Sequence, residues 1–174
     1  MHQAIRHEML KFTTTGRRSV LDLTDDITLL IMKYRMNAGV VHIKATHTTA
    51  RVVEQENEPM FHEDLFDHLD RLAPPDGDYR HDKIGTLRTV NVCDGECENG
   101  WAHIQATYLP SSVTIQVSDG ERVKGLWDRV LLFELDHRPR ERNVSVTLIG
   151  IFDDSETSAE STVDHPAVSK VVIG

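Results

Sequence analysis

The sequence has few cysteines, no long apolar run and no excess of basic residues, and each absence excludes a class of protein. Two cysteines in 174 residues are too few for a disulfide-stabilised scaffold. No segment approaches the roughly 18 consecutive apolar residues of a membrane-spanning helix. The net charge is −9, whereas proteins that bind the nucleic-acid backbone carry clustered lysine and arginine. We therefore expect neither a membrane nor a nucleic acid as partner.

Other recognisable signals are absent as well. The N-terminal residues lack the basic-then-apolar pattern of a signal peptide, so the small number of cysteines indicates a reducing, cytoplasmic setting. The sequence has neither a Walker-type glycine-rich loop nor a dinucleotide-binding fingerprint. A chain of 174 residues suits one domain with its own hydrophobic core.

Apolar periodicity and turn residues predict a mixture of strands and helices. Strands are predicted at residues 7–15, 18–23, 40–50, 102–109, 111–118, 128–136 and 144–150. A first helix is predicted over residues 27–37, with Thr24 as N-cap and Gly39 as its end. A second is predicted over residues 59–72, with Pro59 in its first turn. This mixture indicates an α+β domain.

Two segments stand apart from this pattern. Residues 76–101 form a long, polar segment rich in glycine and aspartate, and a loop of that length in a compact domain is usually functional or mobile. Residues 151–165 are acidic and rich in serine and threonine, which is typical of a weakly ordered segment. The last residues, AVSKVVIG, add an edge strand or fray. We therefore expect one domain over residues 1–150 and an acidic, weakly ordered extension over 151–174.

Three histidines form the first candidate site. His47 ends the strand predicted at residues 40–50, His81 lies in the long polar segment, and His103 begins a predicted strand. Three imidazoles with one open position are the usual arrangement of a catalytic zinc or similar divalent ion. The chain has ten histidines, so incidental placement is the alternative interpretation.

The two cysteines are weaker candidates. Cys93 and Cys97 are four residues apart, and no second cysteine pair exists to complete a structural zinc site. We interpret them as small, semi-buried residues or as a redox-sensitive pair. Thiolate catalysis would need an imidazole close by, which spacing alone does not show.

Several carboxylates are candidate general acids or bases. They are Glu54, Glu56, Glu58, Asp94, Glu96, Glu98 and Glu134. Glu134 differs from the others because it interrupts an apolar strand, where an unpaired carboxylate is expensive. It is expected to pair with an arginine or to face a site. Asn57 and Asn99 either hydrogen-bond a substrate or form ordinary turns.

A small anion site is also predicted. Ser111 and Ser112 follow Pro110 at the start of a strand, where hydroxyl and backbone N–H groups can hold an anion. Positive charge comes from the long polar segment, through Arg80, Lys83 and Arg88.

The chain resembles the YjbQ family over roughly residues 1–150. The resemblance rests on the order and spacing of five segments: HTTARVVEQENEP, LAPPDGDYRHD, RTVNVCDGECENGWAH, SSVTIQVSDGERVKGLWDRVLLFELD and RERNVSVTLIG. It implies a β-sandwich of about seven strands with two helices, assembled as a trimer around a threefold axis. The family's recurring histidines match His47, His81 and His103, which implies a shared polar, metal-binding site near a subunit interface.

The resemblance also implies a reaction. Members are known as secondary thiamine-phosphate synthases, which join a pyrimidine methyl diphosphate to a thiazole phosphate and release pyrophosphate. Arg51, Arg80, Lys83 and Arg88 would stabilise the diphosphate, with Ser111 and Ser112 as donors and a divalent ion, Zn²⁺ or Mg²⁺, as cofactor. A histidine-rich site suits a softer metal than Mg²⁺. The expected partner is a small phosphorylated molecule.

Two alternatives stay open. One is a metal-dependent hydrolase of a small phosphorylated or amide substrate. It would use the three histidines as ligands and Glu56, Glu98 or Glu134 as base, with Asn99 beside them. The other is a trimeric binding protein without catalysis.

Six positions depart from the family pattern. Arg51 replaces a glycine, Trp101 stands where many relatives carry histidine, Gln116 replaces a proline, and Lys124, Leu126 and Asp128 replace a leucine, a threonine and a glutamine. The first two adjoin the proposed site.

Overall fold

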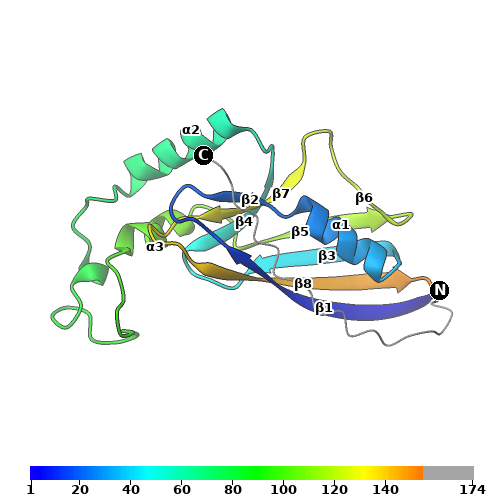
Figure 1. Ribbon diagram of the computed structural model, residues 1–174, viewed down its shortest axis with the longest axis horizontal. Helices are drawn as coiled ribbons and strands as arrows, with labels where there is room; N and C mark the ends of the chain where they lie inside the picture. The colour runs from blue at the N-terminus through cyan, green and yellow to red at the C-terminus, as the bar shows by residue number, and fades with distance from the viewer. Residues whose placement is uncertain (155–174) are drawn as a thin grey trace.

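The structure is a computed structural model that describes residues 1–154 (Figure 1). The described chain forms the eight strands β1 (His2–Thr13), β2 (Val20–Asp22), β3 (Met36–Ala45), β4 (Ala50–Gln55), β5 (Ser112–Ser118), β6 (Glu121–Arg122), β7 (Arg129–Glu134) and β8 (Glu141–Phe152). Its helices are α1 (Thr24–Lys33), α2 (Pro59–Leu72), α3 (Gly100–Ala106) and the short 3₁₀ helix η1 (Arg80–Asp82). The predicted extension lies outside the described residues from residue 155 onward.

Two antiparallel sheets pack face to face, which confirms the predicted α+β sandwich. The larger sheet has the order β1-β8-β3-β5-β6, and the smaller has the order β2-β7-β4. Strand β7 is buried on both faces. Val130 and Leu132 belong to the core between the sheets, whereas Leu131 and Phe133 pack against α2 and α3. Because α2 and α3 cover the face of β7 that points away from the larger sheet, β7 is a nearly continuous apolar run.

Helix α2 has the predicted bounds because local signals and burial agree. Pro59 occupies its first turn, and the Glu58 carboxylate accepts hydrogen bonds from the N–H groups of Met60 and Phe61 at 2.8 and 2.7 Å. These bonds satisfy two of the helix's otherwise unpaired N–H groups. Phe66 and Leu69 then bury one face against β7. None of the described helices is long and apolar enough to cross a membrane.

Residues 102–109 were predicted as a strand, and this is wrong: residues 100–106 form helix α3. The Asp82 carboxylate accepts hydrogen bonds from the N–H groups of Asn99 and Gly100 at 3.0 and 2.9 Å, so a residue 17 positions earlier in the chain starts the helix. Ala102 and Ala106, four apart, are fully buried on one helical face. Because the residue that caps the helix is distant in the chain, the sequence around residues 102–109 did not reveal a helix and was interpreted as a strand.

The boundaries of α1 and of the next strand also differ from the prediction. Helix α1 ends at Lys33 and not near residue 37, because Arg35 takes a left-handed conformation with φ 52° and β3 begins at Met36. The strand predicted over residues 40–50 is divided by a turn at residues 46–49, so its last part is the start of β4. That turn carries His47.

Gly39, predicted to end the first helix, lies inside β3, where the backbone of β8 approaches very closely. It faces Gly150 in register and has φ +142°. A Cβ on Gly39 would lie 2.2 Å from the Ile149 carbonyl oxygen, and a Cβ on Gly150 would lie 2.1 Å from that of Ala38. Glycine is therefore required on both strands at this crossing.

We expect Gly39→Ala to lower the free energy of unfolding by about 1–3 kcal/mol, because the backbones of β3 and β8 must separate to admit the methyl group. Urea denaturation measures the change. Gly85→Ala is the matched control, because its φ is +77° but its Cβ would meet nothing within 4 Å. An equal loss in the two variants would mean that left-handed backbone strain, and not the close approach, decides the cost.

Candidate functional site

The structure divides the three predicted histidines between two places. His47 lies in the turn between β3 and β4, whereas His81 lies in η1 and His103 in α3. The rings of His81 and His103 are in contact in a tilted arrangement, with centroids 4.6 Å apart and an interplanar angle of 49°. The nitrogen atoms of all three histidines do not lie within 4.8 Å of one another. Within one chain they therefore do not form a three-histidine metal centre.

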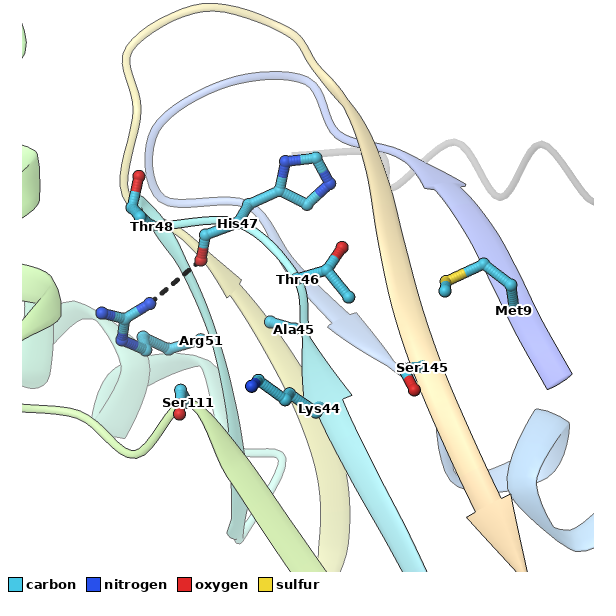
Figure 2. Close-up of a pocket in the computed structure, with 9 residues that line it drawn as sticks. All are labelled: Met9, Lys44, Ala45, Thr46, His47, Thr48, Arg51, Ser111 and Ser145. Atoms are coloured by element: carbon cyan, nitrogen blue, oxygen red, sulfur yellow. Dashed lines mark hydrogen bonds between the residues drawn. The ribbon is translucent and has the colours of Figure 1, made fainter. Parts of the chain in front are cut away.

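A pocket of about 530 Å³ opens beside His47 (Figure 2). It lies on the outer face of the larger sheet, where Ser145 of β8 pairs in register with Met9 of β1 and Lys44 of β3. Its lining residues are Met9, Lys44, Ala45, Thr46, His47, Thr48, Arg51, Ser111 and Ser145. The lining thus contains two cations, an imidazole and four hydroxyl groups, but no carboxylate.

The imidazole of His47 has a defined tautomer. Its Nε2 atom accepts a hydrogen bond from the backbone N–H of Asn143 at 2.9 Å, so the ring proton resides on Nδ1. Burial lowers the pKa of His47, and the nearby Arg142 lowers it further. The ring is therefore a neutral hydrogen-bond donor. Its Nε2 lone pair is engaged and does not suit a metal ion.

Arg51 fixes the turn that carries His47. Its Nε donates to the carbonyl of Ala106 at 2.7 Å, and its Nη1 donates to the carbonyls of His47 and Ala50 at 3.1 and 2.9 Å. Figure 2 shows the bond to His47 and the guanidinium beside Ser111. Among the described residues, Nη2 has no hydrogen-bond partner. One edge of the guanidinium therefore remains for a ligand.

His81 and His103 belong to a second polar cluster, which the long segment after α2 organises. Nη1 of Arg88 donates to Nε2 of His81 at 3.0 Å and to the Glu96 carboxylate at 2.6 Å. Burial lowers the pKa of His103, and His81 and Arg88 lower it further. The hydrogen bond from Arg88 lowers the pKa of Glu96. As at His47, an N–H donor engages the Nε2 lone pair of His81, which leaves it unsuited to a metal.

Asn99 joins this cluster to a buried carboxylate. It is 6% exposed, and its Nδ2 donates to Asp136 at 3.2 Å. Asp136 also accepts from Arg140 at 3.0 Å. Burial raises the pKa of Asp136, but the bond from Asn99 and the charge of Arg140 outweigh it, and the net pKa is lowered. Asn99 is thus a buried polar residue that holds a charged network together.

Glu134 pairs with an arginine, which is one of the two outcomes expected for a carboxylate in an apolar strand. It is fully buried, and Nε of Arg142 donates to its carboxylate at 2.6 Å. The hydroxyl of Thr14 and the N–H of Asp136 donate to the same carboxylate, both at 2.8 Å. With its lone pairs engaged in this way, Glu134 has a structural role. Arg142 in turn donates to Thr49, in the turn that carries His47.

The remaining predicted residues lie at the surface. Glu56, Glu98, Arg80 and Lys83 are exposed, and Lys83 pairs with Asp78. Ser111 lines the pocket, whereas Ser112 is the first residue of β5 and pairs in register with Lys44. Of the predicted anion-binding residues, the pocket therefore gathers Ser111 and Arg51.

The chain matches the family model described as "UPF0047 protein YjbQ-like" over residues 8–151. It belongs to the YjbQ-like UPF0047 family. A UPF0047 protein of Archaeoglobus fulgidus is 31% identical over 137 residues, which are 79% of this chain and 96% of that protein. The UPF0047 protein YjbQ of Escherichia coli O157:H7 is 27% identical over 117 residues, 67% of this chain and 77% of that protein.

Solved structures agree with the YjbQ assignment. A protein of Sulfolobus solfataricus, described as YbjQ-like and of unknown function, has a TM-score of 0.74 and 26% identity, and the match covers 86% of this chain and 100% of that one. A YjbQ/UPF0047 protein of Clostridium acetobutylicum has a TM-score of 0.64 and 25% identity, covering 80% of this chain and 99% of that one. The YjbQ fold is therefore shared.

Two departures from the YjbQ pattern now have a physical interpretation. Arg51, where a glycine is expected, braces the pocket turn and adds positive charge. Trp101 is buried between α3 and α2, and the guanidinium of Arg17 lies 5.1 Å from its ring centroid. Trp101 is two residues from His103 and so lies on a different face of α3. Its side chain lies in the hydrophobic core and leaves the polar cluster intact.

Sequence reasoning missed four polar pocket residues: Lys44, Thr46, Thr48 and Ser145. The alternation of β3 does place Lys44 and Thr46 on one face. It does not show that Ser145, a hundred residues later, is the register partner of Lys44.

We expect Arg142→Met to lower the free energy of unfolding by about 3–5 kcal/mol, because it leaves the buried Glu134 carboxylate without its cation. Urea denaturation measures this loss, and adding Glu134→Gln to the same variant should restore part of it. Arg71→Met, an exposed position in the last turn of α2, should change stability by less than about 0.5 kcal/mol. Equal effects of the two arginine substitutions would contradict a structural role for the pair.

Proposed function

We propose that this YjbQ-family protein binds the phosphate or diphosphate group of a small molecule in the pocket beside His47, and that it acts as a transferase of the thiamine-phosphate synthase type. The observation that carries the proposal is the pocket lining, which has two cations, a neutral imidazole donor and four hydroxyl groups, without a carboxylate. Its volume of about 530 Å³ is typical of small-molecule sites.

Electrostatics favour an anion over a cation in this pocket. A phosphate oxygen roughly 4 Å from Lys44 or Arg51 would gain about 4 kcal/mol from each charge near the protein surface. Nδ1–H of His47 adds a neutral donor. A metal ion would find no carboxylate among the lining residues and an engaged Nε2 on His47, so the pocket suits an anion better than a metal.

The same groups suit the proposed reaction. The bond between the pyrimidine methylene carbon and the diphosphate oxygen breaks, the thiazole nitrogen attacks that carbon, and pyrophosphate leaves. Negative charge accumulates on the leaving group, where Lys44, Arg51 and the hydroxyl of Ser111 are placed to stabilise it. The hydrolase alternative has less support, because it needs a metal held by histidines that the chain keeps apart.

We expect Lys44→Gln to weaken pyrophosphate binding at least tenfold, because it removes a pocket cation and leaves the strand intact. Isothermal titration with inorganic pyrophosphate measures the affinity, and release of pyrophosphate from the pyrimidine diphosphate and thiazole phosphate measures turnover. Lys124→Gln, exposed between β6 and β7, is the control. Equal affinity in both variants would contradict the pocket assignment. Binding without turnover in the wild type would leave a binding protein in place of the transferase.

We also propose that the protein is a homotrimer whose subunits meet on the outer face of the larger sheet. Ile5 and Ile149, which face each other in register, are 64% and 40% exposed, and Met9 and Ile151 on the same face are 47% and 43% exposed. Apolar side chains gathered on one sheet face are typical of an interface. Because Met9 also lines the pocket, a neighbouring subunit there would border the ligand site.

We expect light scattering coupled to size-exclusion chromatography to give a mass of three chains for the wild type, and Ile149→Glu to yield monomers by placing a charge in the contact. Leu29→Glu changes an apolar residue on α1 that is more exposed than Ile149, at 62%, and should leave the mass unchanged. A monomeric wild type, or dissociation by Leu29→Glu alone, would contradict this interface.

A further inference from the structure

Another group of side chains adjoins the second polar cluster through the hydrogen bond from Asn99 to Asp136, and none of its members lines the pocket. It consists of Cys97, Asp136 and His137, one sulfur, one oxygen and one nitrogen ligand atom that all lie within 4.8 Å of one another. Cys97 and Asp136 are 4% and 2% exposed, whereas the side chain of His137 is 43% exposed. Two of the three side chains are thus buried, and the third is open to solvent.

Two of the separations among these atoms match the edges of a zinc tetrahedron, and the third is within 4.8 Å. Zn–S bonds near 2.3 Å and Zn–O and Zn–N bonds near 2.0 Å imply edges of about 3.5 Å from sulfur to oxygen and about 3.3 Å from nitrogen to oxygen. The observed separations are 3.7 Å from Cys97 Sγ to Asp136 Oδ1 and 3.4 Å from His137 Nδ1 to the same oxygen. The ligand atoms therefore need little movement to receive an ion.

The surroundings supply the outer contacts of such a site. Nη2 of Arg140 lies 3.3 Å from Cys97 Sγ and 3.0 Å from Asp136 Oδ2, so it can hydrogen-bond a bound thiolate while leaving Oδ1 for the ion. Independently, Oδ1 of the buried Asn99 lacks a hydrogen-bond partner, although its Nδ2 contacts Asp136. A buried, unpaired carbonyl oxygen is costly, and water in the open fourth position would supply its missing donor.

We propose that Cys97, Asp136 and His137 form a Zn²⁺ site with an open fourth position. Sulfur, imidazole and carboxylate together are the donor set that zinc prefers. On binding, the thiol proton of Cys97 leaves to solvent and the sulfur–zinc bond replaces it. The ion, thiolate and carboxylate then sum to zero charge, and Arg140 stays paired as before. The site uses none of the three family histidines and is independent of the phosphate pocket.

Cobalt(II), which adopts zinc geometry, tests this site in the full-length protein. After treatment with a chelator and a thiol reductant, titration with Co²⁺ alone should produce a thiolate-to-cobalt charge-transfer absorption that saturates at one equivalent. Cys97→Ser should abolish this band. Cys93→Ser should retain it, because Cys93 is exposed and outside the group. Cys93→Ser is therefore the matched control for Cys97→Ser, because both cysteines lie in the same segment.

His137→Ala provides the second test, because a substitution at this exposed position leaves the core intact. It should weaken Co²⁺ and Zn²⁺ binding at least tenfold, with Zn²⁺ affinity measured by competition against a chromogenic chelator. Absence of a thiolate band, a band that disappears with Cys93→Ser, or unchanged affinity in His137→Ala would each overturn the proposal. Pyrophosphate binding is measured in the same variants. Because it depends on the pocket beside His47, it shows whether the zinc site alone or also the proposed phosphate pocket has failed.

Discussion

The buried ion pair between Glu134 and Arg142 is the interaction on which the rest of this structure depends. It joins β7 of the smaller sheet to β8 of the larger one at the end of the sandwich where the polar residues gather. A buried carboxylate is tolerable only when it is fully hydrogen-bonded, and Thr14 and the N–H of Asp136 complete its set. Arg142 extends the network to Thr49 and so to the turn that presents His47. Through Arg142, the buried Glu134 carboxylate thereby holds the pocket turn in place.

The same network explains why the two polar clusters have different chemistry. Around the pocket, the described cations are Lys44 of β3 and Arg51 of β4, and the lining has no carboxylate, which suits a ligand that brings its own negative charge. Around His103 and Asn99, by contrast, carboxylates and arginines already neutralise one another through Glu96, Arg88 and Asp136. An anion gains little there. The histidines that resemblance places in one site are thus divided between an anion pocket and a self-neutralised cluster.

The sequence predicted most of the fold because burial follows local periodicity in most elements. Helix α2 was found to the residue, since Pro59, Glu58 and the apolar spacing act within a few positions. Helix α3 was missed because its start is fixed by Asp82, far back in the chain. The site was predicted less well. The rings of His81 and His103 lie close together, but the position of His47 depends on register between distant strands and on the hydrogen bond from Asn143, neither of which leaves a local pattern.

The connection between β7 and β8 is where these features meet. Within residues 134–142 lie the buried carboxylate, its arginine, and Asp136, His137 and Arg140 of the proposed zinc site. Asn99 and Cys97 contact this connection from the long segment that also carries Arg88 and Glu96. An ion at Asp136 would therefore fix that segment to β7 without touching the pocket. It would also add rigidity to the wall that supplies Asn143 to His47. In this arrangement the proposed ion would stabilise the scaffold, and the chemistry of the pocket would remain that of its own cations and hydroxyl groups.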